Sequence, residues 1–177
     1  MLLIMKKIFL IAFSMYFLFP VIACTTAIIS GKATSDGRPL LWKHRDSDFY
    51  NNKIMFFKGK KYDFIGLTDS EPERDGQVWG GFNKAGFAIM NNASYNLKPA
   101  SDSTKIADME GYFMKNALEN CASVPEFETW LTLQPKPLGV EANFGVIDAN
   151  GGAAYFEVNN FEYTKVDVND PSLAPEG

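Results

Sequence analysis

The sequence predicts an α+β domain of antiparallel strands with two helices inserted between them, and three observations support this. Short runs rich in β-branched and aromatic residues, separated by turns with glycine or asparagine, fill residues 25–92. Similar runs recur at residues 143–168, and two stretches with helical periodicity lie in between, at residues 109–121 and 124–134. Because strands and helices are grouped rather than alternating, the pattern favours an α+β architecture over a parallel βαβ fold.

We expect antiparallel hairpins wherever two such runs flank a short turn with glycine or asparagine. Asn150-Gly151 is the strongest of these turn signals. Residues 69–76 are polar and are expected to form a loop. The expected strands are residues 25–30, 39–44, 53–58, 62–68, 77–82, 87–92, 143–148, 153–158 and 163–168.

The first helix is predicted by apolar residues that recur at every fourth position. The second is predicted to begin at Ser123, because Ser123 and Glu126 form a capping box with Pro125 in the first turn. Both helices should bury one face in the core. The expected buried residues are Met109, Phe113, Met114, Ala117, Leu118 and Cys121 in the first helix, and Phe127, Trp130 and Leu131 in the second.

Residues 1–23 predict a cleavable export signal. Lys6 and Lys7 precede an apolar run at residues 8–19, Pro20 breaks it, and Ala23 ends the segment with a small residue. We therefore expect a signal peptide at residues 1–23 and one exported domain at residues 24–177, periplasmic or extracellular, with no membrane span after cleavage.

Two alternatives to simple cleavage stay open. Residues 21–24 also fit a lipobox, which would make Cys24 a lipid-anchored cysteine. Residues 8–29 could instead form an uncleaved span of about 20 residues. Pro20 argues against the span, and the strand-like run that follows Cys24 at once argues against the spacer usual in lipoproteins.

Composition narrows the functional classes. The chain has 177 residues, 46% of them hydrophobic and 14% aromatic, which suits a single domain with a substantial core. A formal charge of −4 without a basic block argues against nucleic-acid binding. Two cysteines are too few for a disulfide framework, although a bridge between Cys24 and Cys121 is conceivable. With His44 as the single histidine and no metal or nucleotide motif, we expect neither a metal nor another cofactor.

Cys24 is the main candidate for chemistry. Cleavage after Ala23 would give Cys24 a free α-amine beside its own thiol. An N-terminal amine has a pKa of about 7.7–8.0 and can accept a proton near neutral pH. A thiol with its own base is an activated nucleophile that needs no histidine.

Further motifs follow Cys24-Thr25 in a fixed order: an Asp36-Gly37 turn, a strand ending in residues 43–46 (Lys-His-Arg-Asp), and the hairpin 81–86 (Gly-Phe-Asn-Lys-Ala-Gly). This set resembles the N-terminal-nucleophile (Ntn) amide hydrolases, specifically the choloylglycine hydrolase and penicillin acyltransferase-like group. Residues 142–157 are similar to a later segment of the same group. One departure is Lys43, which replaces the usual arginine and keeps the charge without the bidentate geometry.

The resemblance implies a layered αββα sandwich with antiparallel sheets, and it implies roles for five residues. Cys24 would attack the amide carbonyl while its α-amine acts as the base. Asp46 would hold that amine, and Lys43 would stand beside the thiol as a cation. Asn91 would donate to the oxyanion, and Asn143 would orient the nucleophile or substrate.

The implied activity is hydrolysis of a linear amide in a small-molecule substrate, or transfer of its acyl group, with homo-oligomerisation left open. Members of this family continue well beyond the length of this chain, so the chain resembles an amino-terminal portion. We therefore expect residues 24–177 alone to be poorly soluble or associated, and inactive. The competing class is a lipid-anchored surface or binding domain with a modified Cys24 and no catalysis.

Structural interpretations of the same residues also stay open. Lys43, Arg45 and Asp46 could form a solvated strand end, and Asn91 could be an ordinary strand-end residue. His44 could pair with a cysteine in a Cys–His dyad. We treat His44 as structural, because alternation along a strand puts it on the face opposite Lys43.

Overall fold

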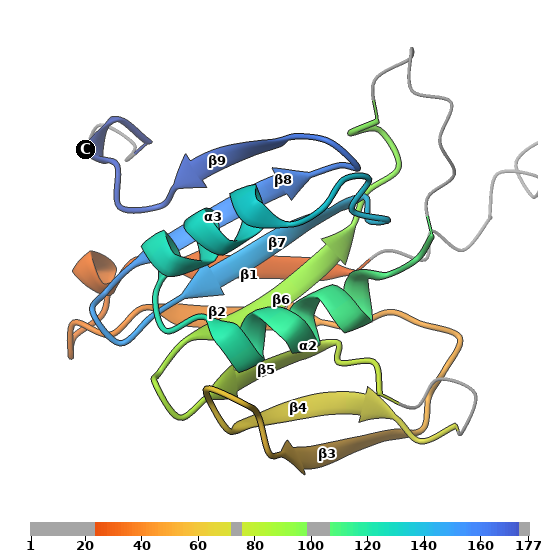
Figure 1. Cartoon of the computed structure of the whole chain (residues 1–177). Coiled ribbons are helices and arrows are strands. Elements are labelled where there is room, and N and C mark those ends of the chain that lie inside the picture. The colour runs from red at the N-terminus through yellow and green to blue at the C-terminus, as the bar shows by residue number, and fades with distance from the viewer. Residues whose placement is uncertain (1–23, 72–75, 99–106, 174–177) are drawn as a thin grey trace, which may run out of the picture.

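The computed structural model describes residues 24–71, 76–98 and 107–173; the expected signal peptide at residues 1–23 lies outside them. Two antiparallel sheets and two α-helices form the described fold, as Figure 1 shows, which confirms the predicted α+β class. The small sheet pairs β1 (Thr25–Ile29) with β2 (Leu40–His44). In order, the large sheet contains β3 (Asn52–Phe57), β4 (Phe64–Asp69), β5 (Gly80–Asn83), β6 (Ala88–Ala93), β7 (Ala142–Ile147), β8 (Ala153–Val158) and β9 (Tyr163–Asp167). The helices are α2 (Glu110–Asn120) and α3 (Val124–Leu133), and two short 3-10 turns are η1 (Gly31–Ala33) and η3 (Pro171–Leu173).

The two helices cover one face of the large sheet (Figure 1). Phe113 of α2 lies 4.7 Å from Phe144 of β7 between ring centroids, and Phe127 of α3 lies 5.0 Å from Phe156 of β8. All four rings are buried, so these aromatic contacts join both helices to the centre of the sheet. The hydrophobic core of the described domain therefore lies between the helices and the large sheet.

The small sheet packs on the opposite face of the large sheet, against β6 and β7 (Figure 1). This close approach uses Gly145, where an added Cβ would lie 3.2 Å from Ile28 Cδ1 of β1. The hydroxyl groups of Tyr155 and Thr26 are 3.3 Å apart and join β8 to β1. Since Thr26 pairs with Lys43 in the register of the small sheet, Lys43 also points toward the large sheet.

Asn83 explains the motif at residues 81–86. Its side-chain oxygen accepts hydrogen bonds from the backbone N–H groups of Ala85 and Phe87, both at 3.1 Å, which closes the β5–β6 turn. Its side-chain nitrogen donates to the carbonyl oxygens of Leu118 and Cys121, at 2.8 and 2.7 Å. These carbonyls lie at the carboxyl end of α2, where no helical partner remains for them. One buried asparagine therefore locks the hairpin to the helix.

The expected elements are all present, with bounds within about three residues of the predictions. Asp69 is a correction: it is the last residue of β4 and completely buried, where a polar loop was expected. Met109 is also a correction, because it precedes α2 and is 40% exposed. Cys121 is buried as predicted, but it and Cys24 are both free, so the conceivable bridge between them is not formed. Among the described residues, no helix combines the length and the apolarity needed to cross a bilayer.

Two apolar surfaces are exposed on the side of the large sheet away from the helices. Ile54 and Phe56 of β3 and Phe82 of β5 are 68%, 64% and 56% exposed. Trp42 and Leu40, on the outer face of the small sheet, are 54% and 49% exposed. The cause is the small size of that sheet, which contacts β6, β7 and β8 and leaves β3 and β4 uncovered. Within the described residues the layers are helix, sheet and sheet, so the second helical layer of the expected αββα sandwich is not among them.

We expect residues 24–177 on their own to self-associate in solution, because grouped apolar surfaces of this kind promote association. Sedimentation velocity should show species larger than a monomer, and Trp42→Ser combined with Phe56→Ser should shift the distribution toward monomer. The matched control is Leu133→Ser, which removes an exposed apolar side chain from the helical side. A monomeric wild-type protein with cooperative unfolding and amidase activity would show this expectation to be wrong.

Candidate active site

One pocket brings together four of the five predicted site residues. Cys24 lies immediately before β1, Lys43 lies in β2, Asp46 follows β2, and Asn91 lies in β6. The pocket has a volume of about 340 Å³ and lies where the small sheet meets the large one. Its lining residues are Cys24, Lys43, Arg45, Asp46, Ser47, Asp48, Phe49, Trp79, Asn91, Ala93, Tyr95 and Asp108.

The Cys24 thiol rests on the backbone of Asp46. The Asp46 N–H points to Cys24 Sγ at 3.5 Å, and the thiol lies 3.5 Å from the Asp46 carbonyl oxygen. Thr25 pairs with His44 at the adjacent end of the small sheet, and this pairing brings the two segments together. The half-buried Cys24 is thus held beside Asp46, the aspartate that ends the motif at residues 43–46.

Lys43 extends from β2 across to the large sheet. Its ammonium group donates to the Asn91 side-chain oxygen at 2.7 Å and to the Trp79 carbonyl oxygen at 3.0 Å. Burial lowers the pKa of Lys43 from 10.5 to about 8; the Cys24 thiolate opposes this shift, and the Arg45 charge adds to it. At neutral pH Lys43 therefore still carries its charge, close enough to Cys24 for the two to interact.

Asn91 has a defined orientation because of Lys43. An ammonium can only donate, so the atom facing Lys43 is the side-chain oxygen. The Asn91 amide nitrogen is then left with two donors and makes no hydrogen bond within the ranges that the structure describes. Since Asn91 is only 6% exposed and lines the pocket, these donors are available to a group bound there.

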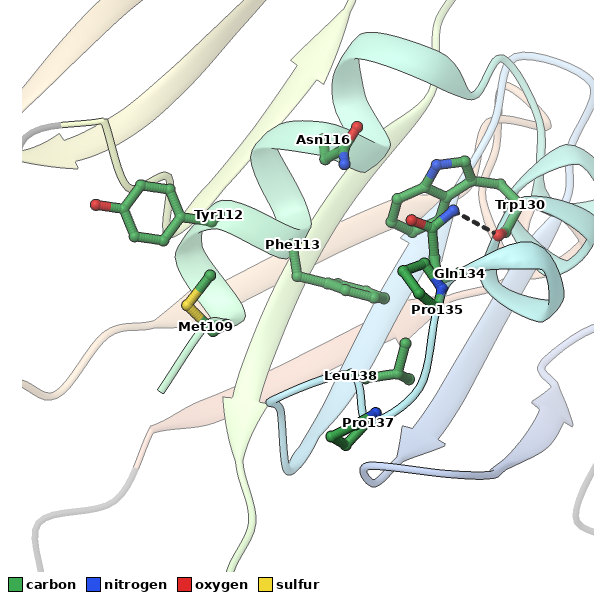
Figure 2. Close-up of a pocket in the computed structure, with 9 residues that line it drawn as sticks. All are labelled: Met109, Tyr112, Phe113, Asn116, Trp130, Gln134, Pro135, Pro137 and Leu138. Atoms are coloured by element: carbon green, nitrogen blue, oxygen red, sulfur yellow. Dashed lines mark hydrogen bonds between the residues drawn. The ribbon is translucent and has the colours of Figure 1, made fainter. Parts of the chain in front are cut away.

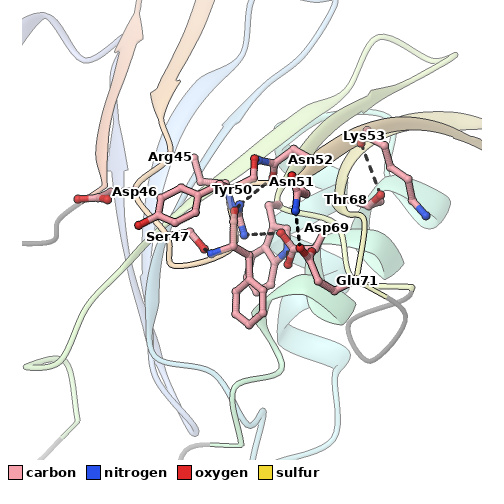
Figure 3. Close-up of polar contacts among 12 residues, drawn as sticks. Arg45, Asp46, Ser47, Tyr50, Asn51, Asn52, Lys53, Thr68, Asp69 and Glu71 are labelled. Atoms are coloured by element: carbon pink, nitrogen blue, oxygen red, sulfur yellow. Dashed lines mark hydrogen bonds and ion pairs between the residues drawn. The ribbon is translucent and has the colours of Figure 1, made fainter.

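Arg45 is held by a network of hydrogen bonds beside the pocket (Figure 3). Its guanidinium donates to Asp69 Oδ1 and to Asn52 Oδ1, both at 2.8 Å, and to the Phe49 carbonyl at 3.1 Å. Asp69 Oδ2 accepts the Trp79 indole N–H at 2.8 Å, and Arg45 lies 5.3 Å from the centre of the Trp79 ring. The strand end at residues 43–46 is therefore organised around the pocket and not simply solvated.

Two candidate residues are not part of this pocket. Asn143 lies in β7 opposite Asn92, and its side-chain oxygen is buried without a hydrogen-bond partner among the described residues. It does not line the Cys24 pocket, so its predicted role stays a prediction. His44 is exposed in β2, on the face opposite Lys43, and is also absent from the lining, as the strand alternation predicted.

Sequence reasoning missed three residues of the site. Arg45 belongs to the recognised box but has no predicted role, Trp79 has no predicted role either, and Asp69 falls in the expected loop at residues 69–76. A detectable signal was the acidic residue directly after the apolar strand of residues 64–68, since a charge at such a position needs a partner when it is buried. Its partner, Arg45, lies 24 positions away in the sequence and could not be identified from local pattern.

A second cavity adjoins the pocket. It has a volume of about 470 Å³, lies between β2 and strands β5 and β6, and shares Lys43, Arg45 and Trp79 with the Cys24 pocket. Most of its other lining residues are apolar. They are Pro39, Leu40, Leu41, Leu67, Gly80, Gly81, Phe82, Ala88, Ile89, Met90 and Ile147.

A further pocket lies on the helical side, between α2 and α3 (Figure 2). It has a volume of about 210 Å³, and its centre is formed by Phe113 and Trp130, whose rings are 5.0 Å apart. The Gln134 side-chain N–H donates to the Trp130 carbonyl, so that amide is already bonded. No cysteine, histidine or acidic residue lines this pocket, which makes it a poor candidate for amide chemistry. No cluster of three potential metal ligands occurs in the described parts of the chain.

In the described residues, an antiparallel sheet is covered by helices on one face and by a smaller sheet on the other, which is three of the four layers expected for the αββα sandwich of an Ntn hydrolase. Comparison with solved structures supports this fold. A cysteine-to-alanine mutant of conjugated bile acid hydrolase from Clostridium perfringens superposes with a TM-score of 0.57 at 18% identity. The alignment covers 83% of this chain and 51% of that one, so the chain spans about half the length of the bile acid hydrolase.

Two other solved structures are similar but less closely superposed. An arginine-to-leucine variant of the same bile acid hydrolase gives a TM-score of 0.48 at 18% identity, over 68% of this chain and 44% of that one. Penicillin V acylase from Agrobacterium tumefaciens gives 0.42 at 17% identity, over 82% and 41%. No protein-family model matches the chain, and no curated protein matches it by sequence. The superposition on the cysteine-to-alanine mutant, with its TM-score of 0.57, is the one that supports the Ntn-hydrolase fold predicted from the motifs.

Proposed function

We propose that this protein is an exported cysteine hydrolase of the Ntn type, which cleaves a linear, non-peptide amide or transfers its acyl group. The observation that carries the proposal is the grouping of Cys24, Lys43, Asp46 and Asn91 around one pocket. These residues come from three separate segments of the sequence and supply a nucleophile, a cation, a carboxylate and an amide donor. The likeness to amide hydrolases in fold agrees with the same chemistry.

The reaction would proceed through an acyl-enzyme. Once the chain is cleaved after Ala23, the α-amine of Cys24 takes the thiol proton, and the thiolate attacks the amide carbonyl to form a C–S bond. The negative oxygen that develops accepts hydrogen bonds from the Asn91 amide. The C–N bond then breaks as the α-ammonium returns its proton to the leaving amine. Water, or a second amine in a transfer reaction, cleaves the thioester and restores Cys24.

Asp46 and Lys43 would hold this arrangement in place. The Asp46 backbone contacts Cys24 Sγ and both residues line the pocket, which supports a role for the Asp46 carboxylate in binding the α-ammonium of the same cysteine. Lys43 adds a fixed positive charge that favours the attacking thiolate and binds the oxygen of Asn91. The Asn91 nitrogen is thereby directed to the oxyanion.

The adjoining apolar cavity suggests which end of the substrate is apolar. An acyl group would fit the 470 Å³ space between β2 and β6, which shares Lys43 and Trp79 with the reaction pocket. The amine would leave through the polar pocket that contains Asp46 and Asp48. We therefore propose a small-molecule substrate with an apolar acyl group as the one that fits best.

Mass spectrometry of the protein exposed to activated amides tests this proposal. We expect the mature N-terminus to be Cys24 and a fatty-acyl p-nitroanilide to leave one acyl group on the Cys24 peptide. The competing lipid-anchored domain predicts a permanently modified Cys24, whose sulfur would have to leave its contact with the Asp46 backbone. A lipidated Cys24, or an unmodified Cys24 that never becomes acylated by any amide, would contradict hydrolase function.

A further inference from the structure

Asp69 is a completely buried charged residue near the site, and the proposed reaction gives it no role. It lies at the end of β4, and its carboxylate binds Arg45 and the Trp79 indole, each at 2.8 Å. A buried carboxylate is costly unless charged and hydrogen-bonded groups compensate it. These two partners, Arg45 and Trp79, line the Cys24 pocket.

The first connection from Asp69 to the nucleophile goes through Trp79. The indole N–H donates to Asp69, while the backbone carbonyl of the same residue accepts a hydrogen bond from Lys43 at 3.0 Å. The Trp79 N–H also donates to the Leu67 carbonyl at 2.8 Å, which ties this segment to β4. Fixing the indole therefore fixes the carbonyl that holds the Lys43 ammonium.

The second connection goes through Arg45. This residue is directly before Asp46, whose backbone N–H and carbonyl both lie 3.5 Å from Cys24 Sγ. The Arg45 side chain is only 12% exposed and spans from Asp69 to the Phe49 carbonyl, so it closes residues 45–49 into a fixed turn. Anchoring Arg45 therefore sets the backbone position against which the Cys24 thiol rests.

We propose that Asp69 is a positioning residue for the nucleophile, which holds Lys43 through Trp79 and holds the Asp46 backbone through Arg45. This inference rests on the proposed role of Cys24. Asp69 touches neither the sulfur nor a substrate position, since it does not line the pocket. It acts by joining the two structural supports of Cys24 to one buried carboxylate.

The test is the rate at which iodoacetamide alkylates Cys24 in the full chain, followed by peptide mass spectrometry. In Asp69→Asn, Arg45 loses its buried partner, so we expect its guanidinium to turn toward solvent and to withdraw the Asp46 backbone. Loss of a nearby cation and of this contact should slow alkylation of Cys24 by about tenfold. Trp79→Phe keeps an aromatic ring but removes the indole donor, and it should slow alkylation by about threefold, the effect of one hydrogen bond.

Two internal controls separate positioning from a general loss of stability. Cys121 is buried, and burial raises the pKa of its thiol to about 12, so its rapid alkylation would report unfolding. Asp148→Asn removes a carboxylate that is also buried, at the α3 and β8 end of the domain, where it accepts hydrogen bonds from Val124 and Gly152. We expect Asp148→Asn to leave the Cys24 rate unchanged.

Each possible outcome decides whether Asp69 positions Cys24. Slower Cys24 alkylation in both site variants, with Cys121 protected and with Asp148→Asn unaffected, supports the proposal. An unchanged or faster Cys24 rate in a folded Trp79→Phe protein overturns it, even where Asp69→Asn fails to fold. An equal change in Asp148→Asn also overturns it. Alkylation breaks the C–I bond of the reagent and no amide bond, so a failure of the proposed hydrolase function would be detected separately.

Discussion

Replacing Cys24 by serine is expected to lower amide hydrolysis by roughly 1,000-fold or more in any form of the protein that hydrolyses an amide. A hydroxyl is a much weaker acid and a poorer nucleophile than a thiol, so the serine variant depends on its base for every step of proton removal. The pocket around Cys24 is built for a thiolate, with the Lys43 charge nearby and the Asp46 N–H directed at the sulfur. Steady-state kinetics with a chromogenic amide measures the effect.

His44→Ala is the matched control for this experiment. His44 is exposed on the outer face of β2 and does not line the pocket, so most of the activity should remain. Thermal unfolding of each variant shows whether the fold has been kept. A folded His44→Ala protein without activity, together with activity that survives chemical blocking of the α-amine, would replace the N-terminal mechanism by a Cys–His mechanism.

Much of the fold follows from local pattern, because strands that are neighbours in the sequence also pair in the sheets. Apart from the connection that carries α2 and α3, each strand of the large sheet pairs with its neighbour in the sequence. Turn residues such as those at residues 83–86 therefore predict both the strands and their pairing. Asn83 shows the limit of this reasoning. Its place in the turn is visible in the sequence, whereas its bonds to the end of α2 depend on how the helix packs.

Only part of the candidate site was predicted, because only part of it depends on the pairing of neighbouring strands. Cys24, Lys43 and Asp46 lie at the paired ends of one hairpin, so their proximity follows from the register of β1 and β2. Asp69 was missed because its burial depends on Arg45, and two charges that compensate each other have no periodic signal in the sequence. Asn143 was selected by resemblance alone, and its position in β7 does not bring it into the pocket.

Replacing Asn91 by alanine is expected to lower kcat by about 100–1,000-fold with little change in KM, the usual result of removing one oxyanion donor. The geometry supports this because Lys43 occupies the Asn91 oxygen and leaves the nitrogen for the substrate. The alanine variant also removes the acceptor of Lys43, so a second variant is needed. Asn91→Asp keeps an acceptor for Lys43 but has no donor, and it should lose at least as much activity as Asn91→Ala.

Asn92→Ala supplies the comparison that decides between a specific donor and a general effect at the end of β6. Asn92 pairs with Asn143 across the strands and does not line the pocket, so its loss should leave kcat close to the wild-type value. Equal losses in the Asn91 and Asn92 variants would assign the effect to strand structure. Full activity in Asn91→Asp would show that the oxygen toward Lys43, and not the amide donor, is what the reaction requires. Since the two asparagines are adjacent but only one faces the cysteine pocket, this pair of variants separates oxyanion stabilisation from packing.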